Sequence, residues 1–149
     1  MAELQFVVFK LGKEEYGVNI MQVQEIGSYL EPVKVPNTPE FIEGVINLRG
    51  IVIPVINLKK RFNISGQNLT ENTRTVVVNL KDKQVALIVD DASEVLTLDE
   101  ADIQETPEII AGVDRKYITG IGKKEDRLLI ILDLNFLFSE QEQVQLATI

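Results

Sequence analysis

The apolar residues of this chain gather in short runs that are separated by glycine, asparagine, aspartate and lysine. The runs are rich in valine and isoleucine, and runs of this kind bounded by turn-forming residues are typical of β-strands. The pattern predicts strands over residues 6–11, 16–20, 45–48, 51–56, 75–80, 85–89 and 128–132. The break at Gly12-Lys13-Glu14 suits a hairpin between the first two strands. We therefore expect a mainly β protein.

Helical periodicity is scarce by comparison. Ser139 followed by Glu142 has the spacing of a capping box, which predicts a C-terminal helix. A shorter helix is expected to start near Asn19, with Ile20 and Val23 on one face. Helices are thus minor elements of the predicted fold.

The two halves of the chain resemble each other. Residues 41–62 align without a gap with residues 117–138, and residues 6–26 align with residues 75–95. Identical pairs include Ile42/Ile118, Gly44/Gly120, Leu58/Leu134, Phe62/Phe138 and Glu25/Glu94. Chance similarity between apolar hairpins is the simple alternative, but two aligned blocks in the same order favour an internal duplication.

The duplication predicts two related all-β lobes, at about residues 6–65 and about residues 73–138, and leaves open whether they exchange strands. The polar stretch at residues 66–73 joins them. Many short strands with glycine turns favour small barrels, because closure protects sheet edges. A groove between two such lobes is a common place for a partner to bind.

Composition narrows the function. A net charge of −8 and a pI near 4.6 argue against nucleic-acid binding, which relies on clustered Lys and Arg. The absence of cysteine and histidine excludes thiol catalysis, Ser-His-Asp triads and the usual zinc sites. No apolar run is long enough to span a membrane, and the first residues lack the pattern of a signal peptide. We expect a cytoplasmic protein without metal, cofactor or catalytic residues.

Three acidic residues nevertheless suggest an enzyme as a rival. Asp90 and Asp91 follow one apolar strand and Asp133 follows another, which imitates the Mg²⁺-binding acids of a response-regulator receiver. A receiver requires helices alternating with the strands of a parallel sheet, and that pattern is missing. Acids at strand ends that face solvent are the simpler interpretation.

Arg49 is the remaining candidate for a functional side chain. It lies in the apolar stretch GVINLRGIVIPVINL, residues 44–58, which contains no acidic residue to pair with it. It is either a turn residue with a solvated head or a recognition group for a partner. The equivalent turn of the second half, Lys124-Glu125-Asp126, is ordinary and fully charged, which favours recognition. Pro54 marks an edge strand or a bulge nearby.

Four blocks of the chain closely resemble the CheW family of bacterial chemotaxis coupling proteins. They are residues 11–26, 36–62, 85–98 and 117–138, and the segment EGVINLRGIVIPVINL is the most specific of the matching stretches. The resemblance implies two intertwined five-stranded, SH3-like β-barrels with a shared core. It also implies a scaffold without enzymatic activity, which links the cytoplasmic tips of methyl-accepting chemoreceptors to the regulatory domain of the histidine kinase CheA in membrane-associated arrays.

The family motif also implies a contact surface. It places the coupling residues at Arg49, Val23, Glu25, Gly44 and Val95. Val95 can instead be a core residue, because its repeat equivalent, Ile26, is interpreted as core. An adaptor of a parallel, non-flagellar chemosensory or twitching pathway, or of another kinase, is the alternative function.

Overall fold

The computed structural model describes residues 3–62, 64, 69–80, 83–105 and 117–138, and these residues are mainly β. The strands are β1 (Glu3–Leu11), β2 (Glu14–Asn19), β3 (Val23–Ser28), β4 (Ile42–Leu48), β5 (Ile51–Asn57), β6 (Arg74–Leu80), β7 (Lys83–Val89), β8 (Asp91–Asp99), β9 (Ile103–Gln104), β10 (Ile118–Lys124) and β11 (Arg127–Leu132). The helices are α1 (Leu58–Arg61) and the 3-10 turns η1 (Ile20–Gln22), η2 (Glu100–Asp102) and η4 (Leu134–Phe136).

Every strand predicted from the apolar runs is present, and the hairpin at Gly12-Lys13 is confirmed. The helix expected near Asn19 is a single 3-10 turn, capped by the Asn19 side chain. The pattern missed β3, β8, β9 and β10, which mix polar and apolar residues or are very short. The predicted C-terminal helix lies outside the described residues. Within them, no helix is long and apolar enough to cross a membrane.

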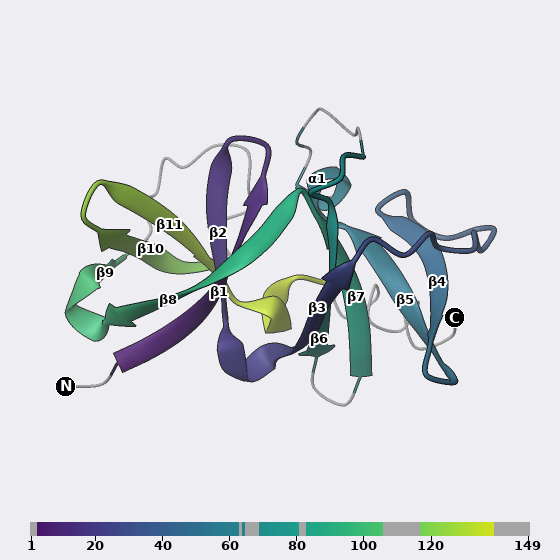
Figure 1. The fold of residues 1–149 in the computed structure, drawn as a ribbon, viewed down its shortest axis with the longest axis horizontal. Coiled ribbons are helices and arrows are strands. Elements are labelled where there is room, and N and C mark those ends of the chain that lie inside the picture. Colours follow the sequence, from purple (N-terminus) through teal and green to yellow (C-terminus); the bar gives the residue numbers. More distant parts are fainter. Residues whose placement is uncertain (1–2, 63, 65–68, 81–82, 106–116, 139–149) are drawn as a thin grey trace.

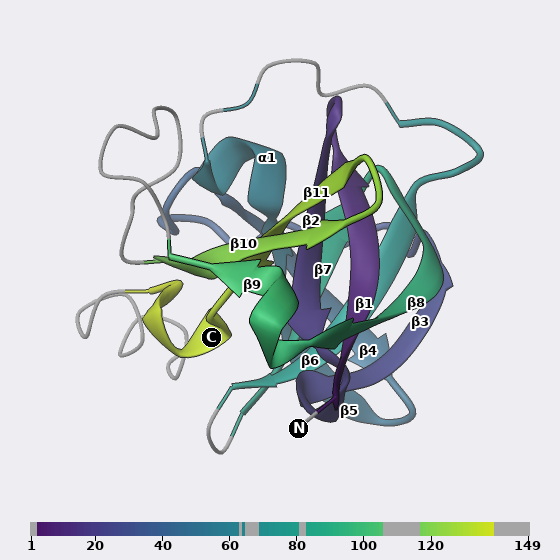
Figure 2. The same ribbon diagram turned by 90° about the vertical axis from the view of Figure 1, so that its left-hand side faces the viewer.

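The strands form two sheets that lie side by side in Figure 1 and one behind the other in Figure 2. Sheet A has the order β8-β1-β2-β11-β10-β9, and sheet B has the order β3-β6-β7-β5-β4. The short strand β9 borders β10 in sheet A, and an isolated bridge at Val33 borders β4 in the same way in sheet B.

The two sheets repeat each other residue by residue. In sheet A, Val7 of β1 is paired with Val95 of β8. In sheet B, the repeat equivalents of these two residues are paired in the same way: Val76 of β6, the equivalent of Val7, is opposite Ile26 of β3, the equivalent of Val95. Both ladders also carry a bulge at the same relative position. The internal duplication seen in the sequence is therefore present in the backbone pairing.

Each sheet combines strands from both halves of the chain. Sheet A takes β1 and β2 from the first half and β8, β9, β10 and β11 from the second, whereas sheet B takes β3, β4 and β5 from the first and β6 and β7 from the second. A parallel pairing joins the two contributions in each sheet, β2 with β11 and β7 with β5. Neither half of the chain can complete a sheet alone.

One core cluster extends across both sheets, and aromatic rings mark its centre. Tyr16 stacks between Phe9 and Phe62, with ring centroids 5.9 and 6.0 Å apart. Arg61 lies over the rings of Phe41 and Tyr117, at 5.1 and 4.9 Å from their centroids. Each fully buried large side chain stabilises the fold by about 1.5–3 kcal/mol, so this cluster holds the two sheets together.

Pro54 does not lie on an edge strand, so that part of its sequence interpretation is wrong. It belongs to β5, which has β4 on one side and β7 on the other. Pro54 is opposite Val45 in the β4 ladder, and the ladder with β7 begins only at Val55. The backbone groups of Val45 bond to Val33 instead of to Pro54. A proline is tolerated here because no ladder bond needs its missing N–H.

Candidate partner-binding surface

Arg49 lies at the tip of the β4–β5 hairpin. Leu48 is paired with Ile51, which leaves Arg49 and Gly50 as a two-residue turn. Both have positive φ, 51° and 87°, and the Asn47 side chain accepts a hydrogen bond of 2.8 Å from the Gly50 amide. Positive φ at both positions is the backbone of the type I′ turn, which matches the twist of hairpin strands. The turn holds the Arg49 side chain outward, 72% exposed.

The acidic partner of Arg49 is Glu25, which lies 24 positions earlier on β3. The guanidinium makes two hydrogen bonds to the carboxylate, one from each terminal nitrogen, and the bond from Nη2 to Oε2 is 3.1 Å long. The Arg49 hydrogen bonds hold the pKa of Glu25 below its ordinary value. Such a bidentate pair fixes both side chains in one geometry. The charge that the stretch 44–58 leaves unpaired is therefore paired in the tertiary structure.

This ion pair connects opposite edges of sheet B, because β3 is the first strand of the sheet and β4 is the last. A bulge lies directly before Glu25, where the register with β6 shifts between Val23 and Glu25. Val23 packs against the main core, and Ile26 is 39% exposed. The interpretation of Ile26 as a core residue is wrong, because the bulge and the edge position leave its side chain at the surface.

Gly44 is buried, and the fold requires a glycine at this position. Its φ is 144°, and a Cβ atom added there would lie 2.1 Å from the carbonyl oxygen of Val33. That close approach allows two backbone hydrogen bonds between Val33 and Val45, of 2.8 and 2.9 Å. At the repeat equivalent, Gly120, an added Cβ atom would likewise lie 2.9 Å from the carbonyl oxygen of Gln104. In both halves, the lack of a side chain at this glycine allows the neighbouring backbone segment to approach closely.

Val95 lies apart from the other predicted contact residues. Val23, Glu25, Gly44 and Arg49 are all in sheet B, whereas Val95 is in β8 of sheet A. Its side chain is 48% exposed, so it is not a core residue. The structure thus brings four of the five predicted residues into one sheet.

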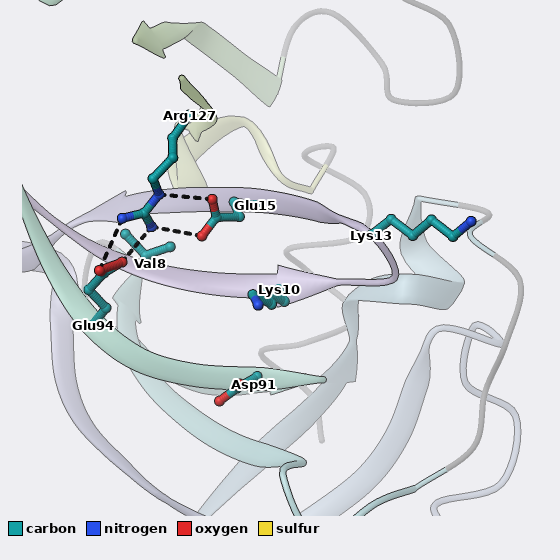
Figure 3. A pocket seen from close by; sticks show the side chains of 7 residues that line it. All are labelled: Val8, Lys10, Lys13, Glu15, Asp91, Glu94 and Arg127. Carbon is teal, nitrogen blue, oxygen red and sulfur yellow. Dashed lines mark hydrogen bonds and ion pairs between the residues drawn. The ribbon is translucent and has the colours of Figure 1, made fainter. Parts of the chain in front are cut away.

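Sequence reasoning missed an arginine of the second half. Arg127 starts β11 and binds two carboxylates (Figure 3). Its Nε and Nη2 donate to Glu15 at 3.1 and 2.8 Å, and its Nη1 and Nη2 donate to Glu94 at 3.1 and 2.5 Å. Glu94 is the repeat equivalent of Glu25. The sequence comparison considered only the turn Lys124-Glu125-Asp126, and Arg127 escaped it because this arginine lies two positions beyond the equivalent of Arg49.

Two of the three acids of the rival enzyme hypothesis, Asp90 and Asp133, have structural partners. Asp90 accepts a hydrogen bond of 2.7 Å from the Gly12 amide and pairs with Lys59 at 2.9 Å. Asp133 caps η4 by accepting from the Asn135 amide at 2.9 Å. Among the described residues, no three histidines, cysteines or acids are grouped so that they can hold a metal ion.

The surface around Arg49 combines an exposed charge with exposed apolar side chains. Ile51 and Val52 follow the turn and are 56% and 61% exposed. An arginine flanked by exposed apolar residues is a common composition for the energetic centre of a protein–protein interface. The arrangement is suited to binding another protein.

Comparison with known proteins agrees with this interpretation. The sequence model of the CheW-like domain matches residues 5–142. The chemotaxis protein CheW of Klebsiella aerogenes is 41% identical over 138 residues, which covers 93% of this chain and 83% of the relative. Chemotaxis protein CheW of Bacillus subtilis is 37% identical over 137 residues, covering 92% and 88%. The crystal structure of the scaffolding protein TtCheW from Thermoanaerobacter tengcongensis superimposes with a TM-score of 0.88 at 40% identity, covering 95% of this chain and 96% of that chain.

Proposed function

The chain belongs to the CheW-like domain family, and on that premise we propose that it is a non-enzymatic chemotaxis adaptor. It couples transmembrane chemoreceptors to the histidine kinase CheA and scaffolds the arrays in which the two assemble. The observation that carries the proposal is the similarity to chemotaxis and scaffolding proteins of this family over nearly the whole chain. A parallel, non-flagellar chemosensory pathway would use the same contacts with other receptors.

We propose that the receptor and the kinase are recognised through the surface around the Arg49–Glu25 pair. Arg49 is the exposed recognition group, Glu25 holds it in place, and Val23 supports the strand from the core side. Gly44 contributes by shaping the hairpin, and Val95 is a separate proposed contact position on sheet A. The proposed mode of recognition is an apolar receptor helix bound in a groove between the lobes.

A second part of the proposal concerns how each sheet is closed. We infer that each sheet closes into a small SH3-like barrel. In sheet B, the Arg49–Glu25 pair joins the opposite edges of the sheet. In sheet A, Lys124 of β10 donates to the carbonyl oxygen of Thr97 on β8 at 2.9 Å, which brings two distant strands of that sheet together.

The mechanism requires binding alone. A receptor that contacts one arrangement of the kinase better than another shifts the population between them, and the adaptor supplies the physical link. Modest affinities are sufficient, because contacts within an array add through effective concentration. The proposed location is the cytoplasm, with recruitment to receptor arrays at the membrane.

The proposal is tested by replacing Arg49 with Ala or Glu. Both variants are expected to fold normally, because the side chain lies at a turn outside the core. Uptake into a ternary complex with a receptor fragment and CheA, measured by co-sedimentation, is expected to fall, together with receptor-dependent control of kinase autophosphorylation. Lys13→Ala is the matched control, since Lys13 is an exposed cation in the turn of the β1–β2 hairpin.

Two results would contradict the proposal. If the wild-type protein is not taken up into the ternary complex, the adaptor function is wrong. If the wild-type protein is taken up but Arg49→Glu unfolds or couples as well as Lys13→Ala does, Arg49 has no role in recognition.

A further inference from the structure

The two edge strands that carry the proposed contact residues share a structural weakness. Among the described strands of sheet A, β8 pairs through its backbone ladder with β1 alone, and its register shifts between the pairs Val8–Glu94 and Phe9–Ala92. In sheet B, the backbone ladder of β3 likewise involves β6 alone among the described strands, and it has an equivalent bulge directly before Glu25. A bulge in an edge strand interrupts the ladder, so the direction of the next side chains needs another restraint.

An arginine from a hairpin supplies that restraint in each sheet. Arg49 binds the glutamate after the bulge of β3, and Arg127 binds the glutamate after the bulge of β8. The two arginines are not equivalent in the repeat, since Arg127 lies where the first half has Ile51. Two different positions thus bring an arginine to repeat-equivalent carboxylates, Glu25 and Glu94.

Arg127 also reaches further than Arg49. Its guanidinium holds Glu94 of β8 and Glu15 of β2 at the same time, across β1, which lies between these strands (Figure 3). In sheet B, the equivalent of Glu15 is Gln84, and its side-chain amide donates to Gln24 at 3.0 Å instead. A planar fork with several donors can bind two carboxylates in fixed geometry, whereas an ammonium group cannot. The pKa of Glu94 is lowered by its hydrogen bonds from Arg127.

We propose that Arg127 is a positioning residue of the partner-binding surface. By clamping Glu94 to Glu15, it fixes the bulge of β8 and thereby the direction of Val95, the next residue, whose side chain is half exposed. Arg127 acts through β8 and not by touching the partner. This inference rests on the proposed function, because it assigns Val95 to the contact surface.

The experiment compares Arg127→Gln and Arg127→Lys with Lys123→Gln, which removes a cation from an exposed position of the same hairpin. Binding to the receptor fragment and CheA is expected to weaken about tenfold in Arg127→Gln, the scale typical of residues that modulate binding without contacting the ligand. Arg127→Lys should be intermediate, because it keeps the charge but not the fork. Lys123→Gln should bind like the wild type.

Two further measurements separate positioning from global stability. Hydrogen exchange of the β8 amides near the bulge should accelerate in Arg127→Gln while exchange in β3 stays unchanged, because the clamp is local. The melting temperature should stay close to that of Lys123→Gln, because Arg127 and Glu94 are partly open to solvent, which screens their ion pair and limits its contribution to overall stability.

Each contrary result has a distinct meaning. If the wild-type protein binds and Arg49→Ala weakens binding, but Arg127→Gln binds like the wild type, only the role of Arg127 is refuted. Unfolding of Arg127→Gln would assign Arg127 to the overall fold and overturn the positioning role. If the wild-type protein does not bind at all, the proposed function fails and the role of Arg127 fails with it.

Discussion

Replacing Gly44 with alanine tests whether this residue shapes the fold or touches a partner. An added Cβ atom would meet the carbonyl oxygen of Val33 at 2.1 Å, at a backbone φ of 144° that alanine rarely adopts. The strained φ costs about 1–3 kcal/mol. Displacing Val33 also breaks its two hydrogen bonds to Val45, at about 0.5–1.5 kcal/mol each. Together these costs predict that the variant loses about 2–6 kcal/mol of unfolding free energy.

A loss of that size is a large share of the roughly 5–15 kcal/mol by which a domain is stable, so it is easily measured. The assay is urea unfolding followed by circular dichroism, because the chain contains no tryptophan. Gly27→Ala is the control, since a Cβ atom at Gly27 meets nothing within 4 Å. If Gly44→Ala is as stable as Gly27→Ala yet fails to bind receptor or kinase, the structural role is refuted and Gly44 belongs to the contact surface itself.

Two further predictions concern groups that the fold holds in place. Asp90→Ala should lower the unfolding free energy by about 1–3 kcal/mol, because it removes the acceptor for the Gly12 amide and the carboxylate beside Lys59. Asp91→Ala is the control. Equal stability of the two variants in urea unfolding would contradict this role of Asp90. Burial, followed by the nearby charge of Glu14, raises the pKa of Tyr16 from 10.0 to about 12. Between these pH values the unfolded chain loses this proton and the folded protein keeps it, so stability should fall as pH rises. An absorbance titration of tyrosinate in the folded protein measures the pKa of Tyr16. If all tyrosines titrate near pH 10, the raised pKa of Tyr16 is contradicted.

Much of the fold could be predicted from the sequence because strand formation leaves a local pattern. The apolar runs located the strands with strong patterns, and the duplication was visible as two ungapped alignments. The strands that the pattern missed have a physical reason for their weak signal. In β3, half-buried and exposed residues alternate next to a bulge, and β10 contains two glycines, so neither resembles a strongly apolar run. Ile26 was misplaced for the same reason, since a bulge shifts the face on which a side chain lies.

The candidate site could be predicted only in part. The family motif selected Arg49 and Glu25 separately, but nothing in the sequence said that they bind each other. Arg127 escaped because its two partners lie 112 and 33 positions away and belong to different strands. Gly44 was selected for a contact role, and its close approach to Val33 became visible only in the folded backbone.

By itself, the sequence determined the mainly β character, the repeat, and the lack of histidine and cysteine chemistry. These properties depend on composition and on short-range pattern, and both can be read without knowing which strands meet. The tertiary structure decided that each sheet combines strands from both halves, that Glu25 binds Arg49, and that Arg127 joins two strands across a third. Strand pairing and ion pairing bring together residues that are far apart along the chain, and only the folded backbone fixes which of many possible partners each one meets.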